Sequence, residues 1–259
     1  MRVLVTGGAR RIGAAIAREM AARGHAIALH HHHSPEEAEA LATELRGSGA
    51  ASVCVLSGEL ADPATPAALI AAARAQLGGP IAAVVNNASL FAFDRPPIAD
   101  YALLDRHMHI NLAAPVALAM AMAAQDDLDD GAVVNLLDQK LANLNPDFFS
   151  YTCSKLALEG ATTMLAQALA PRIRVNAVSP GLTLPSLDQT ADEFAQTARQ
   201  NLLERAVDAG DIARTVAHLI ETRSITGQNV FVDCGQRFVR RDGDVMFSTR
   251  ARPEAGADA

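Results

Sequence analysis

A carboxylate, a phenol and an ammonium group occur in this chain at a spacing that suits proton transfer. Asp138 follows an apolar stretch expected to form a strand at Ala132–Leu137, and Tyr151 and Lys155 follow it. In a helix, residues four apart lie on one face, so Tyr151 and Lys155 are expected to be neighbours. An adjacent positive charge lowers the pKa of a phenol and makes it a proton donor near neutral pH. Such an acid suits a reaction in which a hydride arrives and a proton must follow.

The N-terminal region has the pattern of a turn that binds a dinucleotide. An apolar stretch at Arg2–Thr6 is followed by Gly7, Gly8 and Gly13, and helical periodicity covers Ile12–Arg23. Small residues between a strand and a helix let the backbone approach a pyrophosphate, which binds at the helix N-terminus. Alone, this pattern also fits an ordinary connection between a strand and a helix. Its position directly after the first strand favours the nucleotide interpretation.

These motifs and three further segments resemble the short-chain dehydrogenase/reductase family. The further segments are NNAS at Asn86–Ser89, Asn111 within INLAAP, and VSPG at Val178–Gly181. All occur in the family's order, at its spacing, between the N-terminus and about Gly235. The resemblance implies an oxidoreductase in which Asn111, Tyr151 and Lys155 belong to the catalytic set.

Three departures from the family pattern resemble its pteridine reductase branch, which includes dihydromonapterin-reductase-like members. Arg11 replaces the middle glycine of the turn, Ser89 replaces the last glycine of NNAG, and Asp138 replaces the catalytic serine. Phe91 falls where that branch places an aromatic ring that stacks on the pterin. The resemblance therefore implies a pterin-like substrate held by Phe91, Ser89, Asp138 and Tyr151.

The chemistry of Asp138 favours the same branch independently. Carbonyl reduction builds negative charge on oxygen, which an ionised aspartate would repel. Reduction of a C=N bond requires the nitrogen to gain a proton, and a carboxyl group can relay that proton or balance the charge. The competing interpretation is that Asp138 merely caps a turn in a non-catalytic relative. Retention of Asn111, Tyr151 and Lys155 disfavours it.

The end of the second expected strand indicates NADP as the cofactor. Enzymes that use NAD normally carry an acidic residue there for the ribose hydroxyls, but none occurs before Glu36, which already lies in the next helix. Arg11, His32, His33 and Ser34 instead offer positive charge and donors for a 2′-phosphate. A metal site is not expected, because adjacent strand residues point to opposite faces. An expression tag would be terminal.

By resemblance, the complete cofactor site is expected to extend along the chain, with Glu59 where the family usually has an aspartate facing the adenine. Its expected residues are Gly7, Arg11, Ile12, Gly13, His32, His33, Ser34, Glu59, Leu60, Asn87, Ala88, Ser89, Tyr151, Lys155, Pro180 and Gly181.

Composition is typical of a soluble enzyme and excludes several other classes. The net charge is −7, which offers no basic surface for nucleic acid or an anionic membrane. The longest apolar run, Leu112–Ala124, is too short for a bilayer, and no signal peptide is expected before the first strand. Three cysteines without metal-ligand spacing fit a reducing cytoplasm.

Short strands alternating with helices predict one α/β domain: a Rossmann-type, doubly wound parallel sheet of about seven strands. The domain is expected to cover residues 1–238, with a substrate lid at 181–206. Residues 239–259 form a tail, either mobile or laid on a neighbouring subunit. The resemblance implies a homotetramer through long helices at Tyr101–Gln125 and Phe149–Ala170. The remaining expected elements are strands at Ala26–His30, Ser52–Ser57, Ala82–Asn86, Arg174–Val178 and Asn229–Val232, and helices at Pro35–Arg46, Pro63–Leu77 and Asp211–Ile220.

Three functional hypotheses remain open from the sequence. The first is an NADPH-dependent pteridine reductase, the second a reductase of carbonyl compounds with the same fold, and the third a non-catalytic nucleotide-binding protein. Phe91 and Asp138 favour the first over the second. The particular pterin or folate is left open, because these compounds differ in the side chain that meets the lid.

Overall fold

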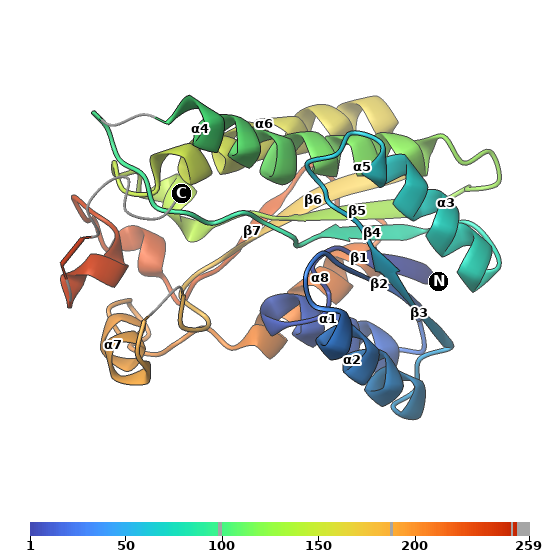
Figure 1. Ribbon diagram of the computed structural model, residues 1–259, viewed down its shortest axis with the longest axis horizontal. Helices are drawn as coiled ribbons and strands as arrows, with labels where there is room; N and C mark the ends of the chain where they lie inside the picture. The colour runs from blue at the N-terminus through green and yellow to red at the C-terminus, as the bar shows by residue number, and fades with distance from the viewer. Residues whose placement is uncertain (98–99, 187–188, 250, 253–259) are drawn as a thin grey trace.

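The computed structural model describes residues 1–97, 100–186, 189–249 and 251–252. Within these ranges, seven parallel strands form one sheet in the order β3-β2-β1-β4-β5-β6-β7 (Figure 1). The strands are β1 (Arg2–Val5), β2 (Ala26–His31), β3 (Ser52–Ser57), β4 (Ala83–Asn86), β5 (Gly131–Leu136), β6 (Ile173–Pro180) and β7 (Asn229–Val232). The predicted doubly wound α/β fold is confirmed.

Helices cover both faces of this sheet, as parallel strands require. They are α1 (Arg11–Ala22), α2 (Pro35–Gly47), α3 (Thr65–Leu77), α4 (Tyr101–Met108), α5 (Ala114–Ala123), α6 (Phe149–Leu169), α7 (Ala191–Thr197) and α8 (Ala209–Glu221). Helices α1, α2 and α8 pack on one face, and α3, α4, α5 and α6 on the other (Figure 1). The strands accordingly consist mostly of buried apolar residues rather than alternating ones.

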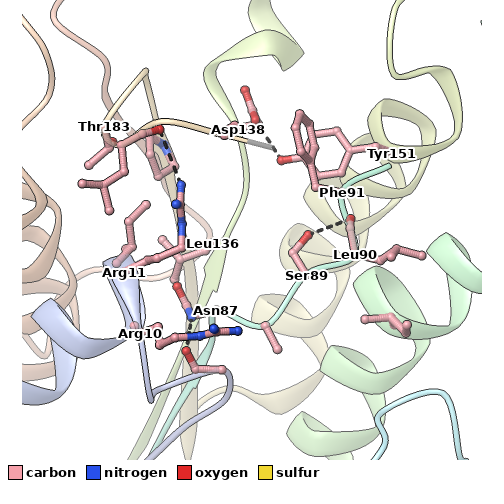
Figure 2. Close-up of a pocket in the computed structure, with 18 of the residues that line it drawn as sticks. Arg10, Arg11, Asn87, Ser89, Leu90, Phe91, Leu136, Asp138, Tyr151 and Thr183 are labelled. Atoms are coloured by element: carbon pink, nitrogen blue, oxygen red, sulfur yellow. Dashed lines mark hydrogen bonds between the residues drawn. The ribbon is translucent and has the colours of Figure 1, made fainter. Parts of the chain in front are cut away.

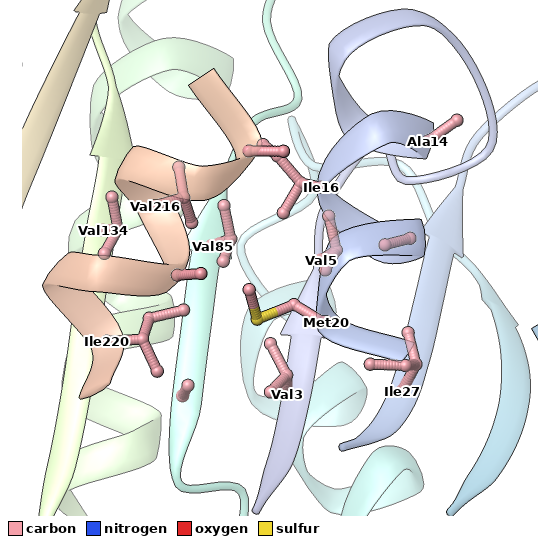
Figure 3. Packing of buried hydrophobic residues seen from close by; sticks show 14 of the residues in the cluster. Val3, Val5, Ala14, Ile16, Met20, Ile27, Val85, Val134, Val216 and Ile220 are labelled. Carbon is pink, nitrogen blue, oxygen red and sulfur yellow. The ribbon is translucent and has the colours of Figure 1, made fainter. Parts of the chain in front are cut away.

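The core on the α1 and α8 side holds the sheet and those helices together. Ile16 and Met20 from α1 and Val216 from α8 pack against Val3 and Val85 of the central strands (Figure 3). All five side chains are fully buried. Burial of such a side chain contributes about 1.5–3 kcal/mol relative to exposure. This rigid layer fixes where the carboxyl ends of the strands lie.

The strand order reverses between β1 and β4, which creates a crevice at their carboxyl ends. From β1 the chain proceeds outward to β2 and β3, and then returns to β4 on the other side of β1. Ligands of open α/β sheets bind at such a point. The glycine turn after β1 and the NNAS segment after β4 therefore meet there.

The long helix expected at Tyr101–Gln125 differs in one respect. A π-helical turn, His109–Ala113, separates α4 from α5, which ends at Ala123. Such turns are rare, and they often occur at functional sites. Asn111 lies inside this turn and is buried. The exposed side chains of Tyr101, Met120 and Met164 lie on α4, α5 and α6, but the expected tetramer stays a prediction.

The expected lid (181–206) and the expected tail (239–259) both contribute residues to the crevice. In the lid region, residues 181–184 and 186 line the pocket described below. Helix α7 begins at a capping box formed by Thr190 and Glu193. Residues 187–188 of the expected lid, and 250 and 253–259 of the expected tail, lie outside the described residues. The other tail residues, 239–249 and 251–252, lie against their own chain, where Val245 and Met246 are buried. In the described part of the chain, no helix has the length and apolar character needed to span a bilayer.

Candidate active site

One cavity of about 920 Å³ opens along the carboxyl ends of the strands. Every residue expected in the cofactor or substrate site lines it, and so do Asp138, Tyr151 and Lys155. Asn111 is the exception among the expected site residues, because it lies behind the wall. The cavity is large enough for a dinucleotide together with a second small molecule, since ligand pockets typically measure about 300–1,000 Å³.

The glycine turn is held tightly from the neighbouring strand. Gly7 adopts a φ of +58°, and a Cβ on Gly13 would lie 2.2 Å from the Gly7 carbonyl oxygen. Neither position accommodates a side chain without strain or collision. The amide of Asn87 donates to the carbonyls of Thr6 and Gly7, both at 3.0 Å. The turn is therefore preorganised, with its backbone N–H groups near the N-terminus of α1.

Arg11 lines the pocket together with His32, His33 and Ser34, and its side chain extends toward the segment 181–186. Its Nη2 is 3.5 Å from the carbonyl oxygen of Leu184, and Figure 2 shows the side chain pointing toward the neighbouring Thr183. Its φ is +56°, a left-handed conformation that costs a non-glycine residue about 1–2 kcal/mol. This explains why relatives of the resembled family carry glycine at this position. Strain of this kind concentrates at functional sites.

Arg10 is one pocket residue that the sequence analysis missed. Its Nη1 lies 3.2 Å from Glu37 Oε1 in the first turn of α2, and Ser34 precedes that helix directly. Arg10 therefore reaches toward the His32–Ser34 segment, which also lines the pocket. The sequence hinted at a role for Arg10, because Arg10 is adjacent to Arg11. The direction of each arginine side chain, however, depends on the geometry of the turn. Glu59 lies at the same end, with Oε2 3.3 Å from His32 Nε2.

The three residues with which the sequence argument began are brought together. The Tyr151 hydroxyl donates to Asp138 Oδ2 at 2.8 Å, and the Lys140 backbone N–H donates to Asp138 Oδ1 at 2.8 Å (Figure 2). Lys155 Nζ donates to the carbonyl oxygen of Leu136 at 2.7 Å, and lies 5.7 Å from the centre of the Tyr151 ring. Tyr151 and Lys155 are 6% and 2% exposed, so water screens these groups poorly.

Burial governs the protonation of this group and corrects one expectation. Burial, and then the Asp138 charge, raise the pKa of Tyr151 well above its usual value, so Lys155 does not lower it in this arrangement. Burial also raises the pKa of Asp138, and lowers that of Lys155 to about 8. The ammonium group bonds a carbonyl rather than the phenol, which explains the failed expectation. Burial thus makes Asp138 easier to protonate than an exposed aspartate, and makes the Tyr151 hydroxyl harder to deprotonate.

Asn111 acts as a brace for the pocket wall. Its Oδ1 accepts from Leu90 N at 2.8 Å and from Ser89 Oγ at 3.1 Å, while its Nδ2 donates to Leu90 O and Ser154 Oγ. Ser154 Oγ in turn donates to the Tyr151 carbonyl. These bonds engage both donors and both acceptor positions of the amide. The Asn111 side chain thus couples the Ser89–Leu90 wall to the helix that carries Tyr151.

Phe91 belongs to an aromatic cluster beside the phenol. Its ring stacks on Phe148 with centroids 4.3 Å apart and meets Tyr151 edge-on at 4.8 Å. Offset stacked and edge-on pairs are the favourable aromatic geometries. One face of Phe91 is thus covered by Phe148, and the ring is fixed where it lines the cavity.

The C-terminal segment 243–249 forms a wall of the cavity that the sequence did not reveal. Asp244, Val245 and Met246 line the pocket together with Lys140. Lys140 Nζ lies 3.0 Å from Asp244 Oδ2, and Asp244 N donates to the wholly buried Asp147 at 2.8 Å. These contacts join residues about 100 positions apart, which no local pattern signals.

Asp147 anchors this segment from a second direction. Its carboxylate accepts from Arg95 Nη1 and Arg252 Nε, each at 3.1 Å. Among the described residues, no group of His, Cys, Asp and Glu side chains is arranged to hold a metal ion. The carboxylates of Asp147 and Asp244 are instead paired with arginine and lysine side chains, namely Arg95, Arg252 and Lys140.

Comparison with known proteins identifies the family. A sequence profile described as enoyl-(acyl carrier protein) reductase matches residues 7–237. The chain belongs to the short-chain dehydrogenase/reductase family. Its curated relatives include 3-oxoacyl-[acyl-carrier-protein] reductase of Staphylococcus aureus, 32% identical over 90% of this chain and 96% of the relative. Dihydromonapterin reductase of Klebsiella pneumoniae is 24% identical over 90% of this chain and 95% of the relative.

The solved structures add a nearer similarity. FolM alternative dihydrofolate reductase 1 of Brucella canis, solved with NADP, is 46% identical, with a TM-score of 0.84. The match covers 92% of this chain and 94% of that one. The sequence resemblance to pteridine reductases depended on three substituted positions. The similarity to the FolM enzyme agrees with it and extends over most of the chain.

Replacing Lys155 with methionine is expected to stabilise the cofactor-free protein at pH 7. A fall in the lysine pKa from 10.5 to about 8 corresponds to roughly 3 kcal/mol against the charged form in the folded state. Loss of the bond to Leu136 offsets about 1 kcal/mol of this gain. The gain should shrink as pH rises from 8 to 10.5, because the native lysine then loses its proton. Urea unfolding across this range tests it, and a less stable variant at pH 7 would contradict the burial argument.

Replacing Asp244 with alanine is expected to destabilise the protein. The side chains of Lys140 and Asp244 are only 4% and 16% exposed, so the variant leaves a buried ammonium with one fewer partner. Breaking a buried pair in this way costs about 3 kcal/mol. The matched control is Asp242→Ala, two residues away and exposed, which should change the unfolding free energy by less than about 0.5 kcal/mol. Equal stabilities of the two variants would show that the segment is not held by this pair.

Proposed function

We propose that this protein is an NADPH-dependent reductase of pteridines, acting on a C=N bond of a dihydropterin, an oxidised pterin or a dihydrofolate. The observation that carries the proposal is the buried hydrogen bond between Tyr151 and Asp138 at the position of the family's serine. Because burial raises the pKa of Asp138, its carboxyl group takes up a proton more readily than an exposed aspartate does. The similarity to the FolM enzyme supports the same substrate class.

The residues divide between binding and proton delivery. When bound, NADPH would supply a hydride to a ring carbon of the substrate, whose C=N bond would become single. The Asp138–Tyr151 pair delivers the proton to the ring nitrogen, directly or through water. Lys155 holds the nicotinamide ribose, and Asn111 keeps the Ser89–Leu90 wall in register with Tyr151.

The substrate site lies between the cofactor and the aromatic cluster. Phe91 offers an aromatic ring for stacking against the bicyclic head of a pterin, supported from behind by Phe148. Ser89 contributes a hydroxyl to the same wall. Val245 and Met246 of the C-terminal segment also line the pocket.

The phosphate-binding residues support NADP rather than NAD. His32, His33 and Ser34 line the pocket beyond β2, where an acidic residue would serve NAD. Arg10 reaches the same place and can form a charge-assisted bond to a 2′-phosphate. Arg11 is placed for the pyrophosphate or the substrate. NADP is also the ligand in the structure of the FolM relative.

A carbonyl reductase is the second candidate, favoured by the similarity to the staphylococcal 3-oxoacyl reductase. A neutral Asp138 could donate a hydrogen bond to a carbonyl oxygen, whereas an ionised one would repel the developing charge. Direct comparison decides between the candidates: NADPH consumption is measured in parallel with a dihydropterin, dihydrofolate and a simple ketone. Turnover of the ketone alone would overturn the proposal.

Asp138→Ser should lower kcat for a dihydropterin by about 10²-fold or more, because a hydroxyl is too weak an acid to replace a carboxyl group near pH 7. The affinity for NADPH should stay within about twofold. The same substitution restores the serine that carbonyl reductases of the family use. The rate of ketone reduction, if the protein has this activity, should therefore not fall together with the rate of pterin reduction. Full pterin turnover by this variant would remove Asp138 from the mechanism.

Arg10→Ala should narrow the preference for NADPH over NADH more than Arg11→Ala does. A charge-assisted hydrogen bond contributes about 1.5–3 kcal/mol, so loss of the Arg10 contact should weaken NADPH about tenfold or more and leave NADH nearly unchanged. Arg11→Ala should weaken both cofactors similarly. Binding is measured by nicotinamide fluorescence, and the opposite ranking would restore Arg11 as the phosphate ligand.

A further inference from the structure

His30 lies between two loops of the cofactor pocket and bonds to both. It occupies β2 and is 2% exposed, yet it borders the cavity. Its Nδ1 is 3.3 Å from the backbone N of Gly7, in the glycine turn, and its Nε2 is 3.0 Å from the carbonyl oxygen of Gly58, just after β3. The two loops come from different strands, and both line the pocket.

The two partners of His30 allow only one form of the ring. The Gly7 N–H can only donate, so Nδ1 must carry a lone pair rather than a proton. The Gly58 carbonyl can only accept, so Nε2 must carry the hydrogen. The geometry therefore selects the neutral imidazole protonated at Nε2, since a charged ring would place an N–H group against the N–H of Gly7.

Backbone hydrogen bonds around His30 also connect the glycine turn and the Gly58 loop to β2. Gly8 N donates to the His30 carbonyl at 2.9 Å, and Gly58 N donates to the His31 carbonyl at 3.2 Å. A side chain would not fit on Gly58, because a Cβ would lie 2.6 Å from Thr65 Cγ2. Each loop is thus tied to the end of β2 by a backbone bond and by the imidazole.

We propose that His30 is a positioning residue for the cofactor, and that its neutral imidazole fixes the separation between the glycine turn and the Gly58 loop. This inference rests on the proposed use of NADPH but not on the pterin. The glycine turn binds the pyrophosphate in this fold. Gly58, Glu59 and Leu60 line the same pocket, and the family resemblance places Glu59 beside the adenine. A bridge that holds both loops before binding lowers the ordering cost of binding.

The electrostatic surroundings of His30 agree with a neutral ring. The pKa of His30 is lowered to about 4, chiefly by burial and also by the neighbouring His31 and His32, although the bond to Gly58 and the charge of Glu59 act in the opposite direction. The folded protein holds His30 neutral, whereas the unfolded chain binds a proton below its pKa of 6.5. The free energy of unfolding should therefore be highest above pH 6.5 and fall as the pH decreases toward 4. His30 should therefore contribute to the acid sensitivity of the cofactor-free protein.

Two conservative substitutions separate the two bonds. Asn places an acceptor near the position of Nδ1 and can keep the Gly7 bond, whereas Gln places a donor near the position of Nε2 and can keep the Gly58 bond. His30→Leu keeps neither. His218→Asn, on the exposed surface of α8, is the matched control.

Calorimetric NADPH binding at pH 7 should show affinities about fivefold weaker for His30→Asn and His30→Gln, and more than tenfold weaker for His30→Leu, with the control unchanged. Gly7 amide exchange, followed by NMR, should accelerate in the Gln and Leu variants but not in the Asn variant. Wild-type affinity in all His30 variants would overturn the inference. Failure of the wild-type protein to bind NADPH would instead overturn the cofactor proposal.

A measurement on the unaltered protein guards against variants that do not fold. The ¹⁵N shifts of the His30 ring should show the neutral tautomer protonated at Nε2 at pH 6. The thermal midpoint of His30→Asn should also fall less steeply than that of wild type between pH 6.5 and 4.5. A charged ring at pH 6, or the other tautomer, would overturn the inference.

Discussion

The hydrogen bond from Tyr151 to Asp138 sets the chemistry of this pocket, and the surrounding structure determines the protonation of both groups. Burial raises the pKa of the carboxyl and of the phenol, and lowers that of Lys155 to about 8. All three shifts favour neutral groups. A carboxyl group that is protonated more readily than usual suits a reaction in which a proton must be given to nitrogen as a hydride reaches carbon.

Such a site lowers the stability of the folded protein, and the packed layers on the sheet compensate for this loss. The desolvated Lys155 and the left-handed Arg11 each act against stability. The apolar layers on both faces of the sheet offset these costs, and the charged residues around the C-terminal segment are paired. The unfavourable features cluster in the crevice between β1 and β4, where a ligand can interact with them.

Local patterns predicted the fold and most of the pocket, because parallel sheets place the ends of consecutive strands together. The sequence alone therefore predicted that one crevice holds the glycine turn, the NNAS segment and the Tyr151–Lys155 pair. The directions of Arg10 and Arg11 could not be predicted, since they depend on a positive φ at a non-glycine residue. The wall formed by residues 243–249 was missed because Lys140 and Asp244 are 104 positions apart.

The central claim is that Asp138 is a proton donor and not an ordinary carboxylate. Titration of the Asp138 carboxyl carbon by ¹³C NMR, assigned through an Asp138→Asn variant, tests it most directly. The account predicts a midpoint clearly above the value of 3.8 that is typical of aspartate. A midpoint at or below that value would mean that Asp138 is no easier to protonate than a free aspartate, and would contradict the proposed route of the proton.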